Sequence, residues 1–344
     1  MSGTTIAFAD LQNRIWAILT GAGMSDVQAD AVARVIAAGE RDACKSHGIF
    51  RIEGVLRTLR AGKVRGDAVP AIADLEDGAI VRIDGQHGFS SPAFELGLPL
   101  LVDRAKALGL AAMVINDCTH FSALWPEVEA VAGHGLAAIV MCPSYATVAP
   151  WGGSEPLFGT NPFAFGWPRQ QVEPYVFDFA TSVAARGEIE LHRRAGTPLP
   201  QGWAIDAQGE PTTSPEAALA GAMLPFGGHK GSALSTMIEL LAGVMIGDLT
   251  SAGALEALGT TALSPAHGEL VIAFSPERFA AGRPGDPFAR AETLFEAIAG
   301  QGARLPSQRR FAARRKAETE GIVLTEAELQ HLDRLAALGL AAAD

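Results

Sequence analysis

Apolar residues recur at helical spacing in the first part of this chain and form short runs in the later part. In residues 8–40 they recur every three to four positions, which predicts two helices. The segment 21–25 separates these helices, and Ser25 is a suitable N-cap for the second one. A further helical pattern covers 50–60. After Pro70, short apolar runs alternate with helical patterns, and this alternation is typical of an α/β protein.

The remaining elements follow from these runs and from the glycines that end them. We expect strands at 79–85, 110–116, 136–142, 175–179 and 269–275. We expect helices at 92–108, 125–134, 184–194, 231–246 (buried) and 287–301, followed by a helical tail at 308–340. The stretch 143–174 is rich in Pro, Gly and aromatic residues and is predicted to be a long loop, which in a compact domain is usually functional. The segment 201–215 is predicted to be an exposed excursion with two turns.

Composition limits the classes of protein to consider. The chain has 344 residues, of which 48% are hydrophobic and 19% charged. This composition excludes a disordered chain and a small disulfide-dependent domain. The net charge of −11 argues against a general nucleic-acid or polyphosphate surface, which needs a basic face. It still allows a few local cations to hold a small anionic ligand.

The first residues, the most apolar window and the cysteines indicate in which compartment to expect the protein. Residues 1–16 lack the basic and apolar segments of a secretory signal. The most apolar window, 233–249, is interrupted by two acidic residues and is too short to span a bilayer comfortably. Cys44, Cys118 and Cys142 are odd in number and widely spaced, which favours neither a disulfide framework nor a zinc knuckle. We expect free thiols in a cytoplasmic protein.

Three polar segments are candidates for chemistry. The first places Ser46 and His47 before a helix that carries Arg51, so a hydroxyl, an imidazole and a carboxylate-binding guanidinium lie close together. The second, 116–122, follows a buried strand, where the ligand sites of α/β sheets gather. The third, 227–232, opens a helix with a Lys between glycines, which suits a phosphate. Each has a structural alternative, namely a helix cap, a polar turn or a tight turn.

Two carboxylates are candidates for acid–base chemistry. Asp178 ends a strand and Glu188 follows ten residues later, and either one can orient a His or accept a proton. Alternatively, Glu188 pairs with Arg186 or His192 on its own helix. The chain lacks a GxGxxG motif after a strand, and it lacks HExxH, CxxC and GxSxG motifs. Its His residues show no metal-ligand spacing, so we expect no metal.

Six ordered blocks of sequence carry a family resemblance. They read KSHGIFR at 45–51, THF at 119–121, VAPWGG at 148–153, GTNP at 159–162, FDFATS at 177–182 and GHKG at 228–231. Together they resemble the type 2 malate/L-lactate dehydrogenase family, whose members lack the Rossmann fingerprint. The resemblance covers nearly the whole chain.

Further blocks are similar to one branch of that family, which reduces Δ1-piperideine-2-carboxylate and Δ1-pyrroline-2-carboxylate. These blocks read HFSALWPE at 120–127, ARGEIEL at 185–191 and GWAID at 202–206. The branch has Asp where this chain has Glu188, so the carboxylate is retained on a side chain that is one methylene longer.

The resemblance implies an α/β fold with a central mixed sheet. The non-Rossmann NAD(P)H-binding domain would cover 71–284, with a long loop at 143–174 and an excursion at 196–226. A helical domain would form from both chain ends, 1–70 and 285–344. Members of the family are homodimers, with the site near the subunit interface.

The resemblance also implies roles for individual residues. His47 would donate the proton, with Ser46 and Glu188 as its relay partners. Arg51 would bind the substrate carboxylate, and His120 would contact both substrate and cofactor. The residues implied in cofactor binding are His120, Phe121, Ser122, Ala123, Leu124, Thr160, Asp178, Phe179, Ala180, His229, Lys230, Arg304, Arg309 and Arg310.

The implied activity is NADPH-dependent reduction of Δ1-pyrroline-2-carboxylate, Δ1-piperideine-2-carboxylate or both, to L-proline and L-pipecolate. The C-terminal Arg cluster favours NADPH, with NADH as a weaker cofactor. We expect no nucleic-acid or membrane partner. Three alternatives stay open: a dehydrogenase of the same family acting on malate, lactate or ureidoglycolate, a metal-dependent hydrolase, and a non-catalytic interaction protein.

Overall fold

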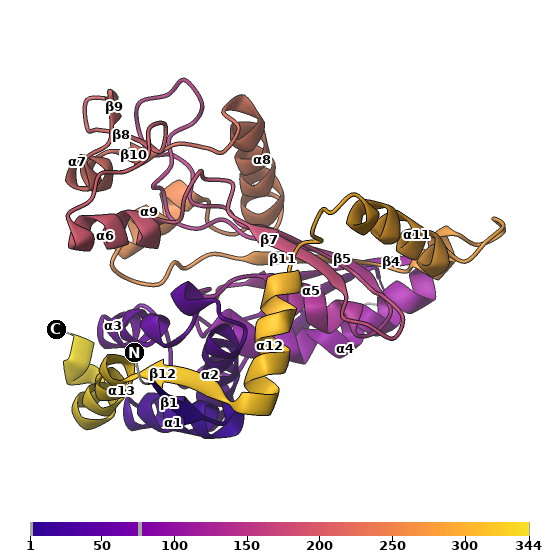
Figure 1. Cartoon of the computed structure of the whole chain (residues 1–344), viewed down its shortest axis with the longest axis horizontal. Coiled ribbons are helices and arrows are strands. Elements are labelled where there is room, and N and C mark those ends of the chain that lie inside the picture. Colours follow the sequence, from indigo (N-terminus) through magenta and orange to yellow (C-terminus); the bar gives the residue numbers. More distant parts are fainter. Residues whose placement is uncertain (1–2, 75–77, 344) are drawn as a thin grey trace.

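The computed structural model of the protein describes residues 3–74 and 78–343, so the outermost ends of the predicted helical domain lie outside the described residues. Figure 1 shows three parts: a central sheet, a group of helices in which both termini lie, and a smaller unit of short strands and helices on the opposite side of the sheet.

A seven-stranded mixed sheet forms the centre of the molecule, as the resemblance implied. Its strand order is β2-β3-β4-β11-β5-β6-β7; β3 and β4 are parallel and the other neighbours antiparallel. The strands are β2 (Ala71–Asp74), β3 (Ile80–Asp84), β4 (Leu110–Asn116), β5 (Ala137–Met141), β6 (Phe163–Trp167), β7 (Tyr175–Phe179) and β11 (Glu269–Phe274). All five predicted strands are therefore confirmed.

Helices cover both faces of this sheet because successive side chains of each strand point to opposite sides. Val271 and Ala273 of β11 pack toward α4 (Ser90–Leu108) and α5 (Trp125–Ala132). Leu270 packs on the other face, toward α8 (His229–Glu239). The predicted helices at 92–108 and 125–134 are thereby confirmed.

The helix predicted at 231–246 differs from expectation in three ways. It begins two residues earlier, and after Glu239 it continues as a π-helix over Leu240–Val244. It is also not buried throughout, because Leu240 and Val244 are 53% and 60% exposed while Ala242 faces the sheet. Within the described residues, no helix is both long and apolar enough to cross a membrane.

The predicted loop 143–174 contains strand β6, so that prediction is wrong in part. Phe163 and Phe165 alternate with the buried Ala164, which is the two-residue period of a strand. The flanking prolines and Gly166 hid this pattern. Gly166 is needed because a Cβ there would lie 2.7 Å from the backbone oxygen of Val128 in α5.

The helical group joins the two ends of the chain. Its members are α1 (Phe8–Gly21), α2 (Asp26–Arg41), α3 (Ile52–Arg60), α12 (Gln308–Glu320), α13 (Glu326–Leu338) and the final 3₁₀ turn η4 (Gly339–Ala343). The side chain of Ser25 caps α2, as predicted. The helical tail predicted at 308–340 is confirmed in α12 and α13 but is interrupted between them. There the chain turns at Gly321 (φ +85°) and forms β12 (Ile322–Thr325), which pairs with β1 (Gly3–Ile6).

The smaller unit has a core of its own around Val148, Phe158 and Ile189. It contains α6 (Arg186–Ala195), α7 (Pro215–Ala220), α9 (Ser251–Leu258) and the short strands β8 (Ala204–Ile205), β9 (Pro211–Thr212) and β10 (Ala222–Met223). The predicted excursion at 201–215 carries the hairpin of β8 and β9.

Two helices follow β11: α10 (Pro276–Phe279) and α11 (Pro287–Gly300). α11 lies beside the outer strands of the sheet, where Phe295 stacks on Tyr175 with ring centroids 5.0 Å apart. The helices α12 and α13, by contrast, lie with α1–α3 (Figure 1). The domain boundaries stay a prediction.

Candidate active site

The first predicted segment folds into two short 3₁₀ turns between α2 and α3. These turns are η1 (Lys45–His47) and η2 (Ile49–Arg51). The buried carboxylate of Glu40 in α2 accepts a hydrogen bond from the Ile49 backbone N–H at 2.9 Å and so holds the second turn. Gly39 allows close packing, because a Cβ there would lie 2.5 Å from the His47 carbonyl oxygen.

These turns bring Ser46, His47 and Arg51 together. The Ser46 hydroxyl lies 3.1 Å from Nδ1 of His47, and Nε of Arg51 donates to the Ser46 carbonyl oxygen at 2.7 Å. Burial and then the charge of Arg51 lower the pKa of His47 to about 3, so this imidazole is neutral near pH 7. Burial also lowers the pKa of Arg51. An anion that pairs with Arg51 would offset the smaller of the two effects on His47 and so favour its protonation.

The second predicted segment lies against the first. His120 is buried, and its backbone N–H donates to the Pro265 carbonyl oxygen at 3.1 Å. Burial, followed by the charges of His267, His47 and Arg51, lowers the pKa of His120 to about 3. The structure therefore brings the predicted proton donor, the predicted carboxylate-binding Arg and His120 into one electrostatic neighbourhood.

Asp178 fixes the segment that follows His120. Its Oδ2 accepts hydrogen bonds from the backbone N–H groups of Leu124 and Trp125, at 2.8 and 2.9 Å. These two N–H groups lie at the start of α5 and have no partner within the helix, and an anion is favourable at this position. Burial nevertheless raises the pKa of Asp178 to about 6, although the two backbone hydrogen bonds oppose the shift.

This raised pKa makes stability depend on pH. Between about pH 4 and pH 6 the folded protein keeps a proton on Asp178 that the unfolded chain has released, so the contribution of Asp178 to stability falls as the pH rises. In Asp178→Asn the amide oxygen still accepts a hydrogen bond but does not titrate. We expect the melting temperature of wild type to fall relative to this variant by on the order of 5 °C between pH 4 and pH 7. Thermal melts of both proteins across that range test this, and parallel curves would contradict it.

Backbone hydrogen bonds tie the other predicted cofactor segments together. The Thr181 N–H donates to the Thr160 carbonyl oxygen at 2.8 Å, and the Phe226 N–H donates to the Thr181 carbonyl oxygen at 3.0 Å. The exposed ring of Phe179 packs edge-on against Phe226, at 5.7 Å between centroids. In addition, the Gly231 N–H of α8 donates to the Phe226 carbonyl oxygen at 3.1 Å, so hydrogen bonds connect Thr160 through Thr181 and Phe226 to the start of α8.

His229 and Lys230 are exposed in the first turn of α8. The turn before them needs Gly228, whose φ is +62° and where a Cβ would lie 3.2 Å from the ring of Trp151. The helix start therefore presents the exposed side chains of His229 and Lys230, an arrangement that suits a phosphate. The backbone N–H groups of Lys230 and Gly231 already donate to the carbonyl oxygens of Gly227 and Phe226.

The C-terminal arginines fall into two kinds. Arg304 and Arg309 are exposed, whereas Arg310 is buried. The guanidinium of Arg310 pairs with Asp42 and Glu129 and lies 4.3 Å from the centroid of the Trp125 ring. Arg310 therefore links α12 to α2 and α5.

Glu188 lies in the first turn of α6, where its Oε2 accepts a hydrogen bond from the Ala185 backbone N–H at 3.0 Å. Within the described residues, its hydrogen bonding therefore caps its own helix rather than reaching His47. The predicted relay role of Glu188 stays a prediction.

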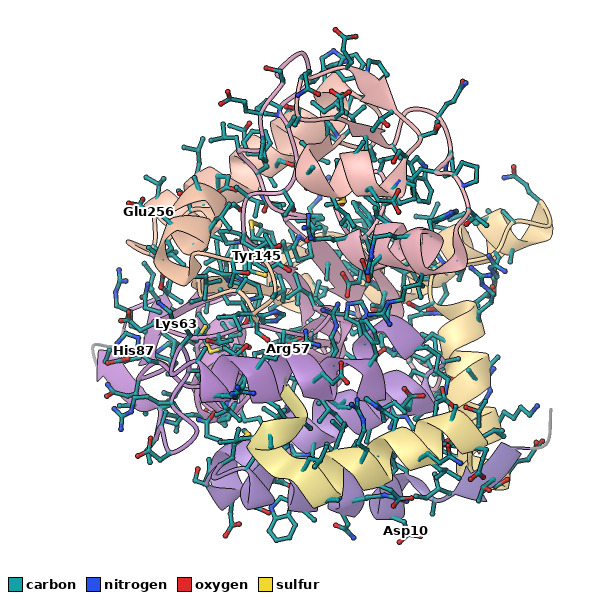
Figure 2. The ribbon with its side chains drawn as sticks, turned by 90° about the vertical axis from the view of Figure 1, so that its left-hand side faces the viewer. Asp10, Arg57, Lys63, His87, Tyr145 and Glu256 are labelled. Atoms are coloured by element: carbon teal, nitrogen blue, oxygen red, sulfur yellow. The ribbon has the colours of Figure 1, made fainter. Side chains whose placement is uncertain are left out.

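Tyr145 is a site residue that the sequence patterns did not indicate. Burial raises its pKa, while the charges of Arg186 and Arg51 oppose the shift, so its ring lies near both arginines. Figure 2 shows Tyr145 between the helical group and the smaller unit. Tyr145 is one of two tyrosines in the chain and lies in the stretch 143–174. Its rarity and this position were the only features of the sequence that could have indicated it as a site residue.

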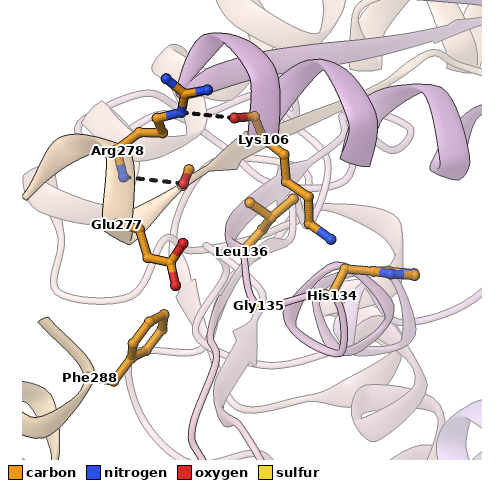
Figure 3. A pocket seen from close by; sticks show the side chains of 8 residues that line it. Lys106, His134, Gly135, Leu136, Glu277, Arg278 and Phe288 are labelled. Carbon is orange, nitrogen blue, oxygen red and sulfur yellow. Dashed lines mark hydrogen bonds between the residues drawn. The ribbon is translucent and has the colours of Figure 1, made fainter. Parts of the chain in front are cut away.

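A separate pocket lies at the opposite end of the sheet (Figure 3). Its lining comes from the end of α4, the turn before β5 and the segment after β11, and it includes Lys106, His134 and Arg278. There Nε of Arg278 donates to the Lys106 carbonyl oxygen at 3.1 Å. None of the predicted site residues lines this pocket.

Comparisons with known proteins agree with the site. The family model described as malate/L-lactate dehydrogenase matches residues 6–333. A Δ1-pyrroline-2-carboxylate reductase of Agrobacterium fabrum is 70% identical over 337 residues, which is 98% of each chain. A Δ1-pyrroline-2-carboxylate/Δ1-piperideine-2-carboxylate reductase of Pseudomonas aeruginosa is 56% identical over 310 residues, 90% of this chain and 92% of the other.

The fold agrees with a solved structure. A crystal structure of Δ1-piperideine-2-carboxylate reductase from Pseudomonas syringae superposes with a TM-score of 0.91 and 42% identity, covering 96% of this chain and 99% of the other. These matches confirm the resemblance seen in the six sequence blocks. The chain belongs to the malate/L-lactate dehydrogenase family.

Proposed function

We propose that this protein reduces Δ1-pyrroline-2-carboxylate, Δ1-piperideine-2-carboxylate or both to L-proline and L-pipecolate, with NADPH as the reductant. One observation carries the proposal: His47, hydrogen-bonded by Ser46, lies in the same pair of turns as Arg51, in a chain 70% identical to a named Δ1-pyrroline-2-carboxylate reductase. A cyclic imino acid needs both a carboxylate partner and a proton donor.

Arg51 and His47 have different roles in the proposed reaction. Arg51 pairs with the substrate carboxylate and so orients the C=N bond. Burial is the main cause of the low pKa of His47, and the substrate carboxylate offsets the second cause, the charge of Arg51. The imidazole then donates a proton to the ring nitrogen. NADPH, when bound, supplies the hydride to C2. One hydride and one proton convert C=N to CH–NH, which balances the reaction.

Ser46 and Glu188 are proposed to orient and stabilise the His47 imidazole, following the logic of a catalytic triad. Ser46 is already within hydrogen-bond distance of Nδ1. Glu188 has to exchange its bond to the Ala185 N–H for one toward His47, and its extra methylene gives the carboxylate a longer reach.

NADPH is proposed to lie along the surface made by residues 120–124, Thr160, 178–180 and the start of α8. His229 and Lys230 would meet the pyrophosphate. The exposed Arg304 and Arg309 would meet the 2′-phosphate, whereas Arg310 would act through the Trp125 ring that it covers. The residues present fit this cofactor.

The protein is further proposed to be a cytoplasmic homodimer. The apolar side chains of Leu240, Val244 and Met245 are at least 53% exposed on adjacent turns, and such a patch supports burial against a second copy. The three free cysteines support a reducing compartment.

One experiment tests the activity. NADPH oxidation is followed with Δ1-pyrroline-2-carboxylate, Δ1-piperideine-2-carboxylate, pyruvate and oxaloacetate in parallel. We expect kcat/KM for at least one imine to exceed that for the 2-oxo acids by about 100-fold, because a site that pairs a buried donor with the ring nitrogen of the substrate discriminates strongly against analogues that lack it. NADH in place of NADPH is expected to lower kcat/KM. Preferred turnover of a 2-oxo acid would favour the 2-hydroxy-acid dehydrogenase alternative, which the name of the family supports.

A further inference from the structure

A group of buried titratable side chains lies beside His120. Glu127 comes from the first turn of α5 and Glu269 from the first residue of β11. One ligand-capable atom from each of these three residues lies within 4.8 Å of the other two, and Nε2 of His120 is 3.9 Å from Oε2 of Glu269. All three residues are at most 3% exposed.

The polar atoms of this cluster are unsatisfied. Within the described residues, Nε2 of His120, Oε2 of Glu127 and both carboxyl oxygens of Glu269 are buried without a hydrogen-bond partner. Buried polar atoms are rarely left in this state, because each costs about 1–3 kcal/mol. A buried carboxyl and a buried imidazole nitrogen this close to each other satisfy both groups if one of them carries a proton toward the other.

The proton is expected on the carboxyl groups rather than on the imidazole. Burial raises the pKa of Glu269 to about 8, and burial together with the charge of Glu269 raises that of Glu127. Burial lowers the pKa of His120 to about 3. The other titratable or charged groups that act on the cluster are Asp178, Glu129, Cys118, Cys142, His267, His47 and Arg51.

A metal ion is a weaker explanation for these residues. Carboxylates and imidazoles that bind metals are held in place by hydrogen bonds to neighbouring groups. Among the residues that the structure describes, Glu269 has no such bond on either oxygen.

We propose that Glu269 is a positioning residue for the reduction: its carboxyl group, which shares protons with Glu127, donates a hydrogen bond to Nε2 of His120 and thereby keeps the imidazole neutral with its proton on Nδ1. This inference rests on the proposed function for its role in turnover. This role requires the Nε2–Oε2 separation of 3.9 Å to shorten to hydrogen-bond distance. Nδ1–H is then the donor that the His120 imidazole carries.

The pH dependence follows from the same groups. Below about pH 8 the Glu269 carboxyl is protonated and donates, and above that pH it becomes an acceptor and the imidazole loses its preferred tautomer. We expect kcat of wild type to fall above a midpoint near pH 8. Glu269→Gln retains a donor that does not titrate, so we expect kcat within about threefold of wild type at pH 7 and no fall near pH 8. Glu269→Ala is expected to lower kcat by about 10- to 100-fold with little change in KM, and Gln at this position restores it.

A readout without substrate separates this inference from the proposed function. In protein with 15N-labelled histidine, the ring-nitrogen signals of His120 are identified as those that disappear in His120→Asn. At pH 7 we expect these signals to show the Nδ1–H tautomer in wild type and in Glu269→Gln. In Glu269→Ala we expect them to show a changed tautomer. Failure of wild type to reduce any imine would refute the proposed function and leave this test intact.

Glu239→Gln is the matched control. Glu239 is a buried carboxylate on the other face of the sheet, bonded to the Asn161 side chain and the Ser251 N–H. The Glu239→Gln substitution is expected to lower the melting temperature without changing the pH midpoint of kcat or the ring-nitrogen signals of His120. Identical pH profiles and tautomers in wild type, Glu269→Gln and Glu269→Ala would overturn the inference. So would one equivalent of bound divalent metal whose removal changes the His120 signals.

Discussion

Replacing His47 with alanine is expected to lower kcat for cyclic imine reduction by about 100- to 10,000-fold, the range found for positioned general acids. His47 is the imidazole that Ser46 hydrogen-bonds and that lies beside Arg51. Burial and the charge of Arg51 lower the pKa of His47 to about 3, and a carboxylate that pairs with Arg51 offsets the second of these causes and favours protonation of His47. Loss of the imidazole therefore removes proton transfer in the occupied site, and kcat falls more than KM rises.

The measurement is steady-state turnover together with an NADPH fluorescence titration. We expect the affinity for NADPH to stay within about threefold of wild type, because removing an interaction made only in the transition state leaves cofactor binding largely unchanged. His134→Ala is a suitable control, since His134 is exposed and lines the pocket at the other end of the sheet. A His47→Ala enzyme that folds, binds NADPH and turns over at the wild-type rate would refute the assignment.

The elements that could be predicted are those whose signal is local. The predicted strands at 110–116 and 175–179 are short apolar runs bounded by turn residues, and the structure has them as β4 and β7. Strand β1 was missed and strand β12 was read as helix, because each is four residues long and pairs with a segment at the other end of the chain. Such pairing leaves no periodic pattern within either segment.

The candidate site shows the same division. Ser46, His47 and Arg51 lie within six residues, so their proximity was visible in the sequence. The sequence did not reveal the cluster of His120, Glu127 and Glu269. Strand β11 comes from a distant part of the chain, enters the middle of the sheet and places Glu269 beside the strands that precede and follow His120. Chain topology creates that contact, and spacing along the sequence does not report it.

The acidity of the chain is compatible with anionic ligands for a related reason. The net charge of −11 is a sum over the whole molecule, whereas a carboxylate or a phosphate responds to the nearest few charges. Arg51 lies beside α3, and Lys230 at the start of α8, so each cation would meet a separate anion.

Replacing Arg51 with alanine is expected to raise KM for carboxylated imines by roughly 30- to 5,000-fold, which corresponds to about 2–5 kcal/mol for removing one partner of a buried charge pair. The Arg51 side chain already donates to the Ser46 carbonyl oxygen through Nε, so its other nitrogens remain for a bidentate pair with the substrate. Arg51→Lys keeps the charge but loses this fork, and we expect its KM to lie between those of wild type and the alanine variant.

A cyclic imine without a carboxylate distinguishes recognition of that group from general damage to the site. For Δ1-pyrroline itself, Arg51→Ala should show no loss of kcat/KM relative to wild type, because the lost interaction is one that this compound never makes. Arg57→Ala provides the control for removing a cation from the same region, since Arg57 pairs with Glu53 on the surface of α3 (Figure 2). The pairing role of Arg51 would have to be abandoned if its alanine variant showed the same KM as Arg57→Ala for carboxylated imines, or if the loss were equally large for Δ1-pyrroline.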